Sequence, residues 1–504
     1  MNRAATVALP ITPPASVTSL IGGKRLPARG PLIPVAYPAN GQVVSQLAEA
    51  DASEVDLAVK AARHAFDHSG WPQLSLEKRH AMLMKLHDIT LAHADELARL
   101  ECLNLGVSMR ELRERHMTRA AYNFRFFAEH ISHSKGQLYD QTAGYRSIVV
   151  REPAGVAALI APWNAPTSLA SMKVAAAIAF GNTCVLKPSE QTPLALSRFV
   201  ELLHEAGLPD GVVNLVNGRG PVTGEALVAH PDVDLVSFTG GTMTGRRIAA
   251  IAGERLKPVT MELGGKSANI IFASADLERA LDAALVGIYS NNGQQCLAGS
   301  RILLERSIAD DFIARFVERS ARIRIGDPML DATELGPLAS ARHRDRVLSF
   351  VDIARKDGAV LLTGGGRPSL GGDLDNGFFA QPTAVLAPNN AAQVCQDEIF
   401  GPFAAFLIFD TYDEAIAMAN GTSFGLVSYV WSDHLPTVER AVRDLRSGVV
   451  WVNTPMVREL RAPFGGYRDS GLGREGGEAC EQFYTEVKTV TVPASPVAIR
   501  KLGA

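Results

Sequence analysis

The chain has 504 residues, and 47% of them are hydrophobic. That apolar content exceeds what one core usually holds, so the sequence predicts at least two domains. Basic and acidic residues nearly balance, at 50 and 53, which argues against a nucleic-acid-binding surface. No stretch of about 18 consecutive apolar residues occurs, so the sequence predicts no membrane-spanning helix.

The first residues and the cysteines suggest a compartment. Pro10, Pro13 and Pro14 interrupt the short apolar run of MNRAATVALPITPPAS, so this segment is a poor signal peptide and is predicted to be a flexible arm. The chain has five scattered cysteines and no Cys-x-x-Cys pair, which argues against a disulfide framework or a structural zinc site. A reducing cytoplasm is therefore expected, where one thiol can be kept for catalysis.

Helices are predicted first along the chain. Apolar residues recur at helical spacing from about residue 53, then over 76–105 and again over 110–130. From about residue 147, short apolar runs alternate with amphipathic helices as far as VTMELGG at 259–265. This alternation predicts a parallel sheet covered by helices on both faces.

A second α/β region is predicted from about residue 267. Its strand candidates run from ANIIF at 268–272 to GVVWVN at 448–453, with helices between them. The tail FYTEVKTVTV at 483–492 alternates like a strand but stands alone. A lone terminal strand needs a partner, either at a sheet edge or in another subunit.

Two segments have features of a nucleotide site. FTGGTMTG at 238–245 follows a predicted strand and opens a helix, where glycines let the backbone approach a pyrophosphate. Its spacing is not GxGxxG, so an ordinary tight turn is the alternative. TCVLKPSE places Lys187 and Glu190 just beyond another strand, on the side of an open α/β sheet where ligands bind. These charges could bind ribose hydroxyls or form a surface ion pair.

Three polar residues are candidates for chemistry. Asn164 in APWNAP could aim its amide N–H at a developing oxyanion, or could cap a turn between two prolines. Glu262 lies among apolar residues before Gly-Gly, so it could act as a general base with a raised pKa, or could pair with a basic side chain. Cys296 lies in the polar loop NNGQQCLAGS, where a thiol is a nucleophile candidate. An incidental loop cysteine is the alternative.

Several short strings together carry a resemblance to a known family. Their order and separations resemble those of the aldehyde dehydrogenase superfamily, in its non-acylating, NAD(P)-dependent form. The resemblance covers the chain from about residue 20 onward, and so many motifs in register leave little room for coincidence. The matching strings are PWN at 162–164, KPSE at 187–190, FTGG at 238–241, ELGGKS at 262–267, GQQC at 293–296, EIFGP at 398–402 and PFGGYRDSGLGRE at 463–475.

The resemblance implies an α/β fold with three parts. These are a Rossmann-like cofactor domain, an α/β catalytic domain and a small β flap for oligomerisation. In this arrangement the tail strand completes a sheet with another subunit, so a homo-oligomer, either a dimer or a tetramer, is expected. The implied boundaries are 1–131 and 148–263 for the cofactor domain, 264–479 for the catalytic domain, and 132–147 and 480–504 for the oligomerisation segments.

The resemblance also implies a mechanism. Cys296 attacks the aldehyde carbon as a thiolate, and the Asn164 side chain and the Cys296 backbone N–H hold the oxyanion of the thiohemiacetal. After hydride transfer to the nicotinamide, a water activated by Glu262 hydrolyses the thioester. A free thiol titrates at about 8.5, so the thiol needs local activation, which Glu262 could supply. Lys173 and Glu475 match positions that assist proton relay in some members.

The expected cofactor is NAD. By resemblance, Lys187 and Glu190 bind the adenosine ribose, and the Glu190 carboxylate repels the 2′-phosphate of NADP. Gly241 stands where many members carry Ser, which removes one hydroxyl from the pyrophosphate site. The other expected cofactor contacts are Glu398 at the nicotinamide ribose, Phe400 beside the ring, Trp163 along the pyrophosphate path, and Phe238, Gly240, Gly245 and Leu263.

The loop NTPMVRELRAPFGG predicts the substrate class. Its R-E-L-R pattern, with Arg458 and Arg461, resembles the branch that acts on hydroxymuconic and carboxymethyl-hydroxymuconic semialdehydes from aromatic-ring breakdown. Arginines clamp the substrate carboxylate in that branch, and planar guanidinium groups match carboxylates well. Arg119 is the candidate for a further arginine, ahead of Arg125. A salt bridge with Glu459 or another subunit is the alternative for these arginines, and a general aromatic or aliphatic aldehyde is the alternative substrate.

Three other functions are alternatives to this one. An acylating dehydrogenase would pass the thioester to coenzyme A, but a water-activating Glu262 favours hydrolysis. A non-catalytic family member with a binding or structural role would not need Cys296, Glu262 and Asn164 together. His64 and His68, four residues apart on a helix, could bind a metal, but no further Cys or His lies close in sequence, so no metal site is expected.

Overall fold

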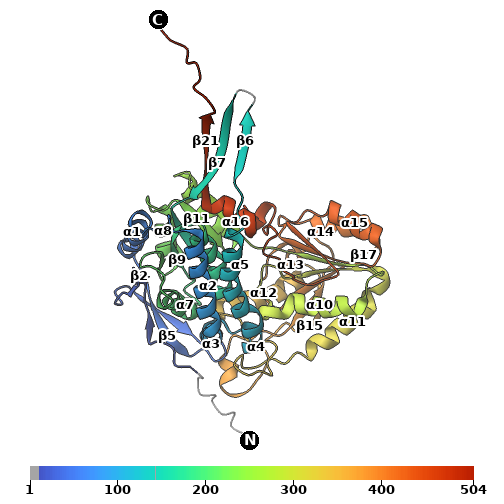
Figure 1. The fold of residues 1–504 in the computed structure, drawn as a ribbon. Coiled ribbons are helices and arrows are strands. Elements are labelled where there is room, and N and C mark those ends of the chain that lie inside the picture. The colour runs from blue at the N-terminus through green and yellow to red at the C-terminus, as the bar shows by residue number, and fades with distance from the viewer. Residues whose placement is uncertain (1–10, 142–143, 504) are drawn as a thin grey trace.

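The computed structural model describes residues 11–141 and 144–503. It consists of two α/β units side by side and a three-stranded sheet that projects away from them (Figure 1). Residues 1–10 of the predicted N-terminal arm lie outside the described residues. In the ranges described, no helix is long and apolar enough to span a membrane.

The first unit contains an eight-stranded sheet in the order β20-β12-β11-β8-β9-β10-β2-β3. The neighbours from β12 to β10 pair in parallel, as the β-α alternation predicts. The edge strand β20 comes from far along the chain and pairs antiparallel with β12. The strands are β2 (Leu20–Ile21), β3 (Lys24–Arg25), β8 (Val156–Ile160), β9 (Thr183–Lys187), β10 (Val213–Leu215), β11 (Leu235–Thr239), β12 (Val259–Glu262) and β20 (Gly471–Leu472).

Both faces of this sheet are buried, because successive side chains of a strand point to opposite faces. Ala157 and Leu159 of β8 join a core with α6 and α7, whereas Val156 and Ala158 join another with α1, α8 and α9. Such two-sided burial accounts for the nearly continuous apolar runs of the sequence. The helices are α1 (Ala52–His68), α6 (Pro166–Ala179), α7 (Leu194–Glu205), α8 (Glu225–Ala229) and α9 (Thr242–Gly253), with a π-helical turn η2 (Gly220–Gly224) before α8.

The helical segments before this sheet differ from their predicted extents. The helix expected over 76–105 divides at His93, whose φ of −101° and ψ of 16° are not helical. A π-helical segment, η1 (Leu112–Met117), interrupts the next helix. The resulting helices are α2 (Leu76–Ala92), α3 (Ala94–Leu105), α4 (Met109–Glu111) and α5 (Thr118–Ile131).

The second unit contains a seven-stranded sheet in the order β15-β16-β17-β14-β13-β18-β19. All neighbours pair in parallel except β15 with β16. The strands are β13 (Ala268–Ile271), β14 (Arg301–Glu305), β15 (Val360–Thr363), β16 (Thr383–Leu386), β17 (Phe403–Phe409), β18 (Val427–Trp431) and β19 (Val449–Val452). The helices are α10 (Leu277–Tyr289), η3 (Ser290–Gly293), α11 (Arg306–Ala321), α12 (Ala341–Lys356), η4 (Gly372–Asn376), α13 (Gln393–Gln396), α14 (Tyr412–Asn420), α15 (Leu435–Asp444) and η5 (Arg468–Ser470).

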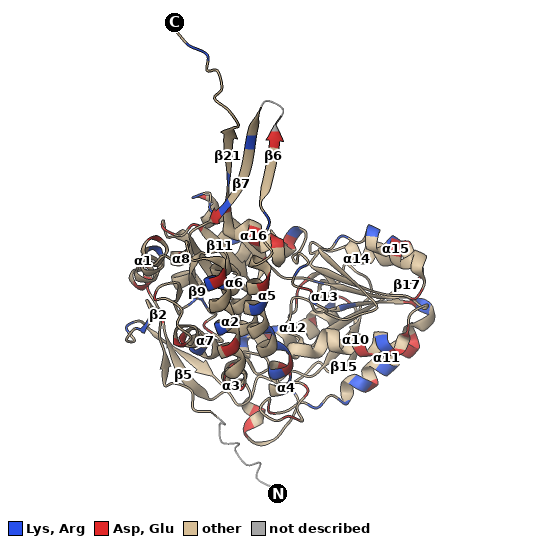
Figure 2. Cartoon of the chain, viewed as in Figure 1, with Lys and Arg blue, Asp and Glu red and all other residues tan. Residues whose placement is uncertain are grey.

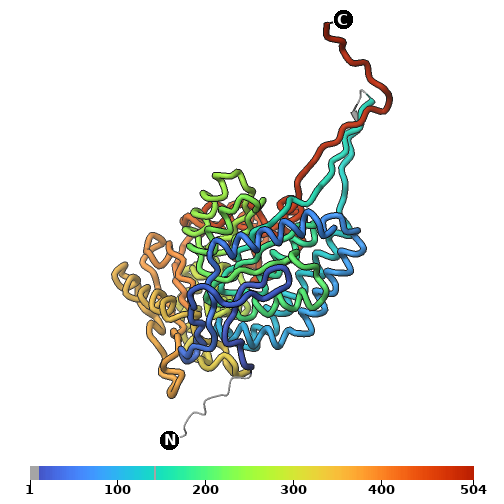
Figure 3. The backbone as a smooth tube through the Cα atoms, turned by 90° about the vertical axis from the view of Figure 1, so that its left-hand side faces the viewer, coloured from blue at the N-terminus to red at the C-terminus, as the bar shows by residue number. Residues whose placement is uncertain are grey.

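The tail strand has its partner within the same chain. Strand β21 (Thr485–Pro493) follows α16 (Gly477–Tyr484) and pairs antiparallel with β7 (Tyr145–Pro153), which also pairs with β6 (Gln137–Gln141). Figures 1 and 3 show this sheet extending away from both units. The division of the chain into three domains at the predicted boundaries stays a prediction.

A small N-terminal sheet, which the sequence did not predict, packs on the first unit. It contains β1 (Ser16–Val17), β4 (Leu32–Ala36) and β5 (Val43–Ala48) in the order β1-β5-β4. Basic and acidic residues alternate along the helices of both units (Figure 2), for example along α11. Arg315 there pairs with Glu278 of α10 at 2.5 Å, in keeping with the balanced composition.

Candidate active site

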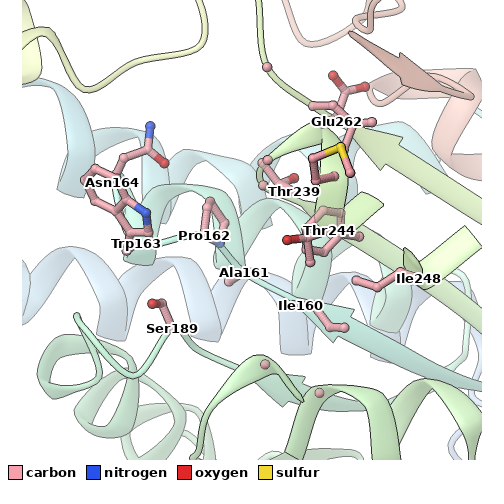
Figure 4. A pocket seen from close by; sticks show the side chains of 18 of the residues that line it. Ile160, Ala161, Pro162, Trp163, Asn164, Ser189, Thr239, Thr244, Ile248 and Glu262 are labelled. Carbon is pink, nitrogen blue, oxygen red and sulfur yellow. The ribbon is translucent and has the colours of Figure 1, made fainter. Parts of the chain in front are cut away.

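A cavity of about 720 Å³ opens where four parallel strands of the first sheet end. Its lining includes the segments just after β8, β9, β11 and β12, the edge at which open α/β sheets bind ligands. The second unit contributes Cys296, His343, Arg346, Glu398 and Phe400. In Figure 4, Asn164 and Glu262 lie on the upper side of this pocket and Ser189 on the lower side.

Hydrogen bonds between two loops hold Asn164 close to the loop that carries Cys296. The Asn164 side-chain amide donates to the Gln294 carbonyl at 2.9 Å. The Asn291 side-chain amide donates to that same carbonyl and to the Asn164 carbonyl, both at 2.8 Å. Asn291 and Asn292 adopt left-handed backbone conformations, with φ of 53° and 56°, which Asn tolerates better than most residues. The loop sequence thus allows the sharp turn that presents Cys296.

The Cys296 thiol lies in the cavity lining and is only partly exposed. Burial first, and then the nearby Glu398 and Glu262 carboxylates, raise its pKa to about 12. The neutral thiol is therefore the resting form at pH 7, and a base must remove its proton before it can attack a carbonyl.

Glu262 ends strand β12 and is buried, with 6% of its surface exposed. Neither of its carboxylate oxygens has a hydrogen-bond partner within the described part of the chain, so the alternative of a direct pair with a basic side chain is not what the structure shows. Burial, and then Glu475, raise its pKa well above the ordinary value, against the effect of Lys173. A carboxylate in this state is suited to accept a proton.

Lys173 and Glu475 form a buried ion pair behind Glu262. The Lys173 ammonium donates to Glu475 Oε1 at 2.7 Å and to the Ser237 hydroxyl at 2.8 Å. The two residues come from α6 and from the segment after β20, so this pair ties the first unit to the C-terminal part of the chain.

The expected cofactor residues line the same cavity, with one exception. Glu398 accepts a hydrogen bond from the Gly265 N–H at 3.0 Å, and burial raises its pKa to about 7. Gly245 belongs instead to a packing contact, since a Cβ there would lie 2.6 Å from Leu263 Cδ2. The lining residues among those expected are Trp163, Lys187, Glu190, Phe238, Gly240, Gly241, Leu263, Glu398 and Phe400.

Comparison with known proteins settles the family. The profile described as "Aldehyde dehydrogenase family" matches residues 27–490. The chain belongs to the aldehyde dehydrogenase family. It is 39% identical to the 2-hydroxymuconic semialdehyde dehydrogenase of Pseudomonas sp. (strain CF600), over 90% of this chain and 94% of that relative. It is 42% identical to the 5-carboxymethyl-2-hydroxymuconate semialdehyde dehydrogenase of Escherichia coli, over 87% of this chain and 93% of that relative.

A solved structure supports the same family and the cofactor. The dehydrogenase is similar to the betaine aldehyde dehydrogenase of Staphylococcus aureus in complex with NAD⁺, with a TM-score of 0.94 and 36% identity over 97% of each chain. The protein is thus an oxidoreductase that acts on aldehydes with NAD, and the predictions of fold class, family and cofactor are confirmed.

Two residues that position others in the dehydrogenase site were not predicted from the sequence. His343 hydrogen-bonds the Phe400 carbonyl at 2.7 Å and packs edge-on to Trp163, and burial lowers its pKa to about 4. Arg346 donates to the Glu398 and Ile399 carbonyls, both at 2.8 Å. Both come from α12, far from the motifs in sequence, and together they hold the segment that carries Glu398 and Phe400.

The candidate substrate arginines of the dehydrogenase separate into two groups. Arg119 and Arg458 are half-buried and close enough for each charge to affect the other; burial first, and then Arg458, lower the pKa of Arg119 to about 10. Arg458 lies over the Phe464 ring at 4.1 Å. Arg461 has an 80% exposed side chain paired with Glu459 at 2.9 Å, the alternative considered from the sequence. The runner-up Arg125 pairs with Glu129 on the surface.

The two hydrogen bonds of the Asn291 side chain predict that replacing this residue lowers the rate without weakening NAD binding. In Asn291→Ser, the two 2.8 Å bonds to the Asn164 and Gln294 carbonyls are lost, so the two sides of the oxyanion site can move apart. Because small misplacements at a reacting centre are costly, we expect kcat to fall by about 10- to 100-fold with KM for NAD little changed. Steady-state kinetics at 340 nm measure this. A matching rise in KM for NAD would show instead that the whole cavity had lost its shape.

Proposed function

We propose that this dehydrogenase oxidises a carboxylated semialdehyde, of the hydroxymuconic or carboxymethyl-hydroxymuconic type, to the corresponding acid. The observation that carries the proposal is the pair of half-buried guanidinium groups of Arg119 and Arg458. In the residues described, neither group has a carboxylate partner within ion-pair distance, although both lie near charged groups of the active site.

The position of Arg458 supports a role beside the reacting centre. Its Nη2 donates to the Glu475 carbonyl at 3.3 Å. Burial lowers its pKa, whereas the Glu475 and Glu262 carboxylates act in the opposite direction. A half-buried guanidinium group is stabilised most by a planar anion that accepts its N–H donors in a bidentate manner. A substrate carboxylate is such an anion. Relatives whose names specify hydroxymuconic substrates support the same class.

We assign the chemical steps to this chain's own residues as follows. A base, for which Glu262 is the candidate, removes the Cys296 proton, and the thiolate sulfur bonds to the aldehyde carbon. The Asn164 amide and the Cys296 N–H stabilise the negative charge on the aldehyde oxygen. Once the carbon is oxidised to a thioester, Glu262 takes a proton from water, the water oxygen bonds to the carbon, and the carbon–sulfur bond breaks. Lys173 and Glu475 carry the proton from Glu262 away from the cavity.

The residues of the cavity fit NAD. The cofactor, when bound, supplies the hydride acceptor. Lys187 and Glu190 would hold its adenosine ribose, Glu398 its nicotinamide ribose, and the N-terminal end of α9, with Gly241 as its cap residue, its pyrophosphate. A glycine cap leaves the first backbone N–H groups of a helix accessible to an anion. Phe400 would pack beside the nicotinamide ring, and Trp163, 5.3 Å from Phe400 between ring centroids, would line the pyrophosphate path.

We also propose that the projecting sheet joins copies of this chain in a homo-oligomer. Apolar side chains are exposed along β6, β7 and β21, which a lone subunit would leave in water. The exposed apolar residues of the sheet include Leu138, Tyr139, Ile148, Val487 and Val492.

The compartment is a further proposal. The five free cysteines suit a reducing compartment such as the cytoplasm.

The substrate proposal is tested by kcat/KM over an aldehyde panel with NAD. The panel contains 2-hydroxymuconic semialdehyde, 5-carboxymethyl-2-hydroxymuconic semialdehyde, succinic semialdehyde, betaine aldehyde, benzaldehyde and hexanal. We expect the carboxylated substrates to lead. In Arg458→Leu and Arg119→Leu, that lead over benzaldehyde should fall by about 10- to 100-fold, the worth of a charge-assisted hydrogen bond.

Two further variants make the result specific. Arg461→Leu removes the exposed competitor, and Arg110→Leu removes an exposed arginine that pairs with Glu114 at 3.2 Å. If Arg461→Leu alone erases the preference, the clamp belongs to Arg461. If neutral aldehydes lead in the wild type and no arginine matters, the enzyme is a general aldehyde dehydrogenase. Release of acid without coenzyme A separates hydrolysis from acyl transfer.

A further inference from the structure

Beside Lys187 and Glu190 lies a second pair of opposite charges. Glu49 follows strand β5 of the N-terminal sheet, and Arg219 follows β10. The Arg219 guanidinium donates two hydrogen bonds to the Glu49 carboxylate, from Nε to Oε1 at 2.8 Å and from Nη2 to Oε2 at 2.5 Å. The Arg219 backbone N–H also donates to Oε1 at 2.9 Å. The Glu49 side chain is 3% exposed, whereas that of Arg219 is 52% exposed.

This ion pair adjoins the cavity. Arg219 directly precedes Gly220 and Pro221, which line the cavity wall. One turn further on, Gly224 packs against the Lys187 stem, since a Cβ there would lie 3.5 Å from Lys187 Cδ and Cε. The charges of the two pairs also act on one another: Lys187 helps to lower the pKa of Glu49, and Glu190 helps to raise that of Arg219, after the larger effect of the Glu49–Arg219 hydrogen bond in each case.

The charges of these four residues sum to zero. Lys187 and Arg219 contribute two positive charges, and Glu49 and Glu190 contribute two negative ones. NAD brings a ribose hydroxyl here, which a neutral cluster accepts, whereas NADP brings a phosphate with close to two negative charges. Because a bidentate carboxylate already occupies the planar fork of Arg219, that cation cannot turn to a phosphate without breaking the pair.

We propose that Glu49 is a second determinant of the preference for NAD over NADP, acting through its grip on Arg219. Glu49 keeps the guanidinium engaged and balances its charge, so Arg219 is not free to bind a 2′-phosphate. The inference rests on the proposed placement of the adenosine ribose at Lys187 and Glu190. It assigns a specificity role to a residue of the N-terminal sheet, outside the cofactor motifs.

The test is the NADP-to-NAD ratio, measured at low salt in two ways: as association constants from calorimetric titration without aldehyde, and as kcat/KM with one aldehyde. In Glu49→Gln, the amide oxygen can still accept from the Arg219 N–H, but the negative charge is gone and the fork is released. We expect the ratio to rise about tenfold, which corresponds to about 1.4 kcal/mol. The gain should shrink in 0.5 M NaCl, because Arg219 is exposed to solvent and salt screens exposed charges.

Further variants decide between explanations. Glu49→Gln combined with Arg219→Ala should lose the gain; persistence of the gain would overturn the role of Arg219. Arg219→Ala alone leaves Glu49 unbalanced beside Lys187, so the ratio should fall below wild type even if Glu49→Gln does not fold. Glu190→Gln reports on the ribose placement itself. If Glu190→Gln raises the ratio and Glu49→Gln does not, this inference is wrong; if neither changes it, the placement of the ribose is wrong as well.

Discussion

Replacing Cys296 by alanine should abolish aldehyde oxidation, with kcat falling by at least about 10⁴-fold, as expected for loss of a covalent nucleophile. Cys296 lines the cavity, whereas the other four cysteines are buried and outside its lining, so no other thiol can replace it. NADH formation at 340 nm gives the rate, and calorimetric titration should show that NAD still binds, because the thiol is not needed to hold the cofactor.

Cys184→Ala provides the matched control. Cys184 lies in β9 with its side chain in the core, so this change removes a thiol without touching the cavity. It should lower the melting temperature by a few degrees, as a small core truncation does, and leave the rate close to that of the wild type. Oxidation by Cys296→Ala at more than about 1% of the wild-type rate would contradict the covalent mechanism.

Glu262→Gln should lower steady-state kcat by about 10²- to 10⁴-fold, the usual worth of a general base. The neutral amide keeps the shape of the side chain but cannot accept a proton from water. If Glu262 acts in thioester hydrolysis, rapid mixing with excess aldehyde and NAD should still give one burst of NADH per active site, followed by a very slow phase. A missing burst would place Glu262 at deprotonation of Cys296, and steady-state rates equal to wild type would exclude both roles.

The pH profile gives an independent check on Glu262. Burial and Glu475 raise its pKa well above the ordinary range, so its protonated form persists toward neutral pH and its basic form grows as pH rises. In the wild type, kcat should therefore increase with pH through this range, and the increase should vanish in Glu262→Gln. Glu254→Gln, an exposed carboxylate at the end of α9, should leave the profile unchanged.

The sequence predicted most of the sheet strands because their chemistry is local. A strand buried on both faces, such as β8 or β17, is a short apolar run bounded by turns, and that pattern needs no knowledge of its neighbours. Strands β4 and β5 were missed because their burial depends on packing against distant helices. The two-residue strand β20 is too short to leave a pattern, and the whole seven-stranded sheet of the second unit lies between it and its partner β12 along the chain.

The residues of the candidate site also differ in whether a local sequence pattern reveals them. Cys296, Glu262 and Asn164, which line one cavity, could be predicted as candidates because each lies in a contiguous motif. The difference between Arg458 and Arg461 was not predictable, since the loop has no periodicity to show which guanidinium points inward. Arg461 pairs with its neighbour Glu459, whereas Arg458 turns onto the Phe464 ring and the Glu475 carbonyl. His343 and Arg346 hydrogen-bond to backbone carbonyls. Every residue carries a carbonyl, so the sequence does not show which residue is the partner.

Strand β20 has a consequence for how the protein is made. Residues 471–472 close the edge of a sheet whose parallel strands are complete by residue 262. During synthesis, the ribosome must therefore add about two hundred residues while β12 exposes its unpaired backbone groups. Open edges of this kind attract other strands, so the nascent chain is most prone to aggregate in that interval. Release of the last segment then completes the first sheet and joins Glu475 to Lys173 in one event.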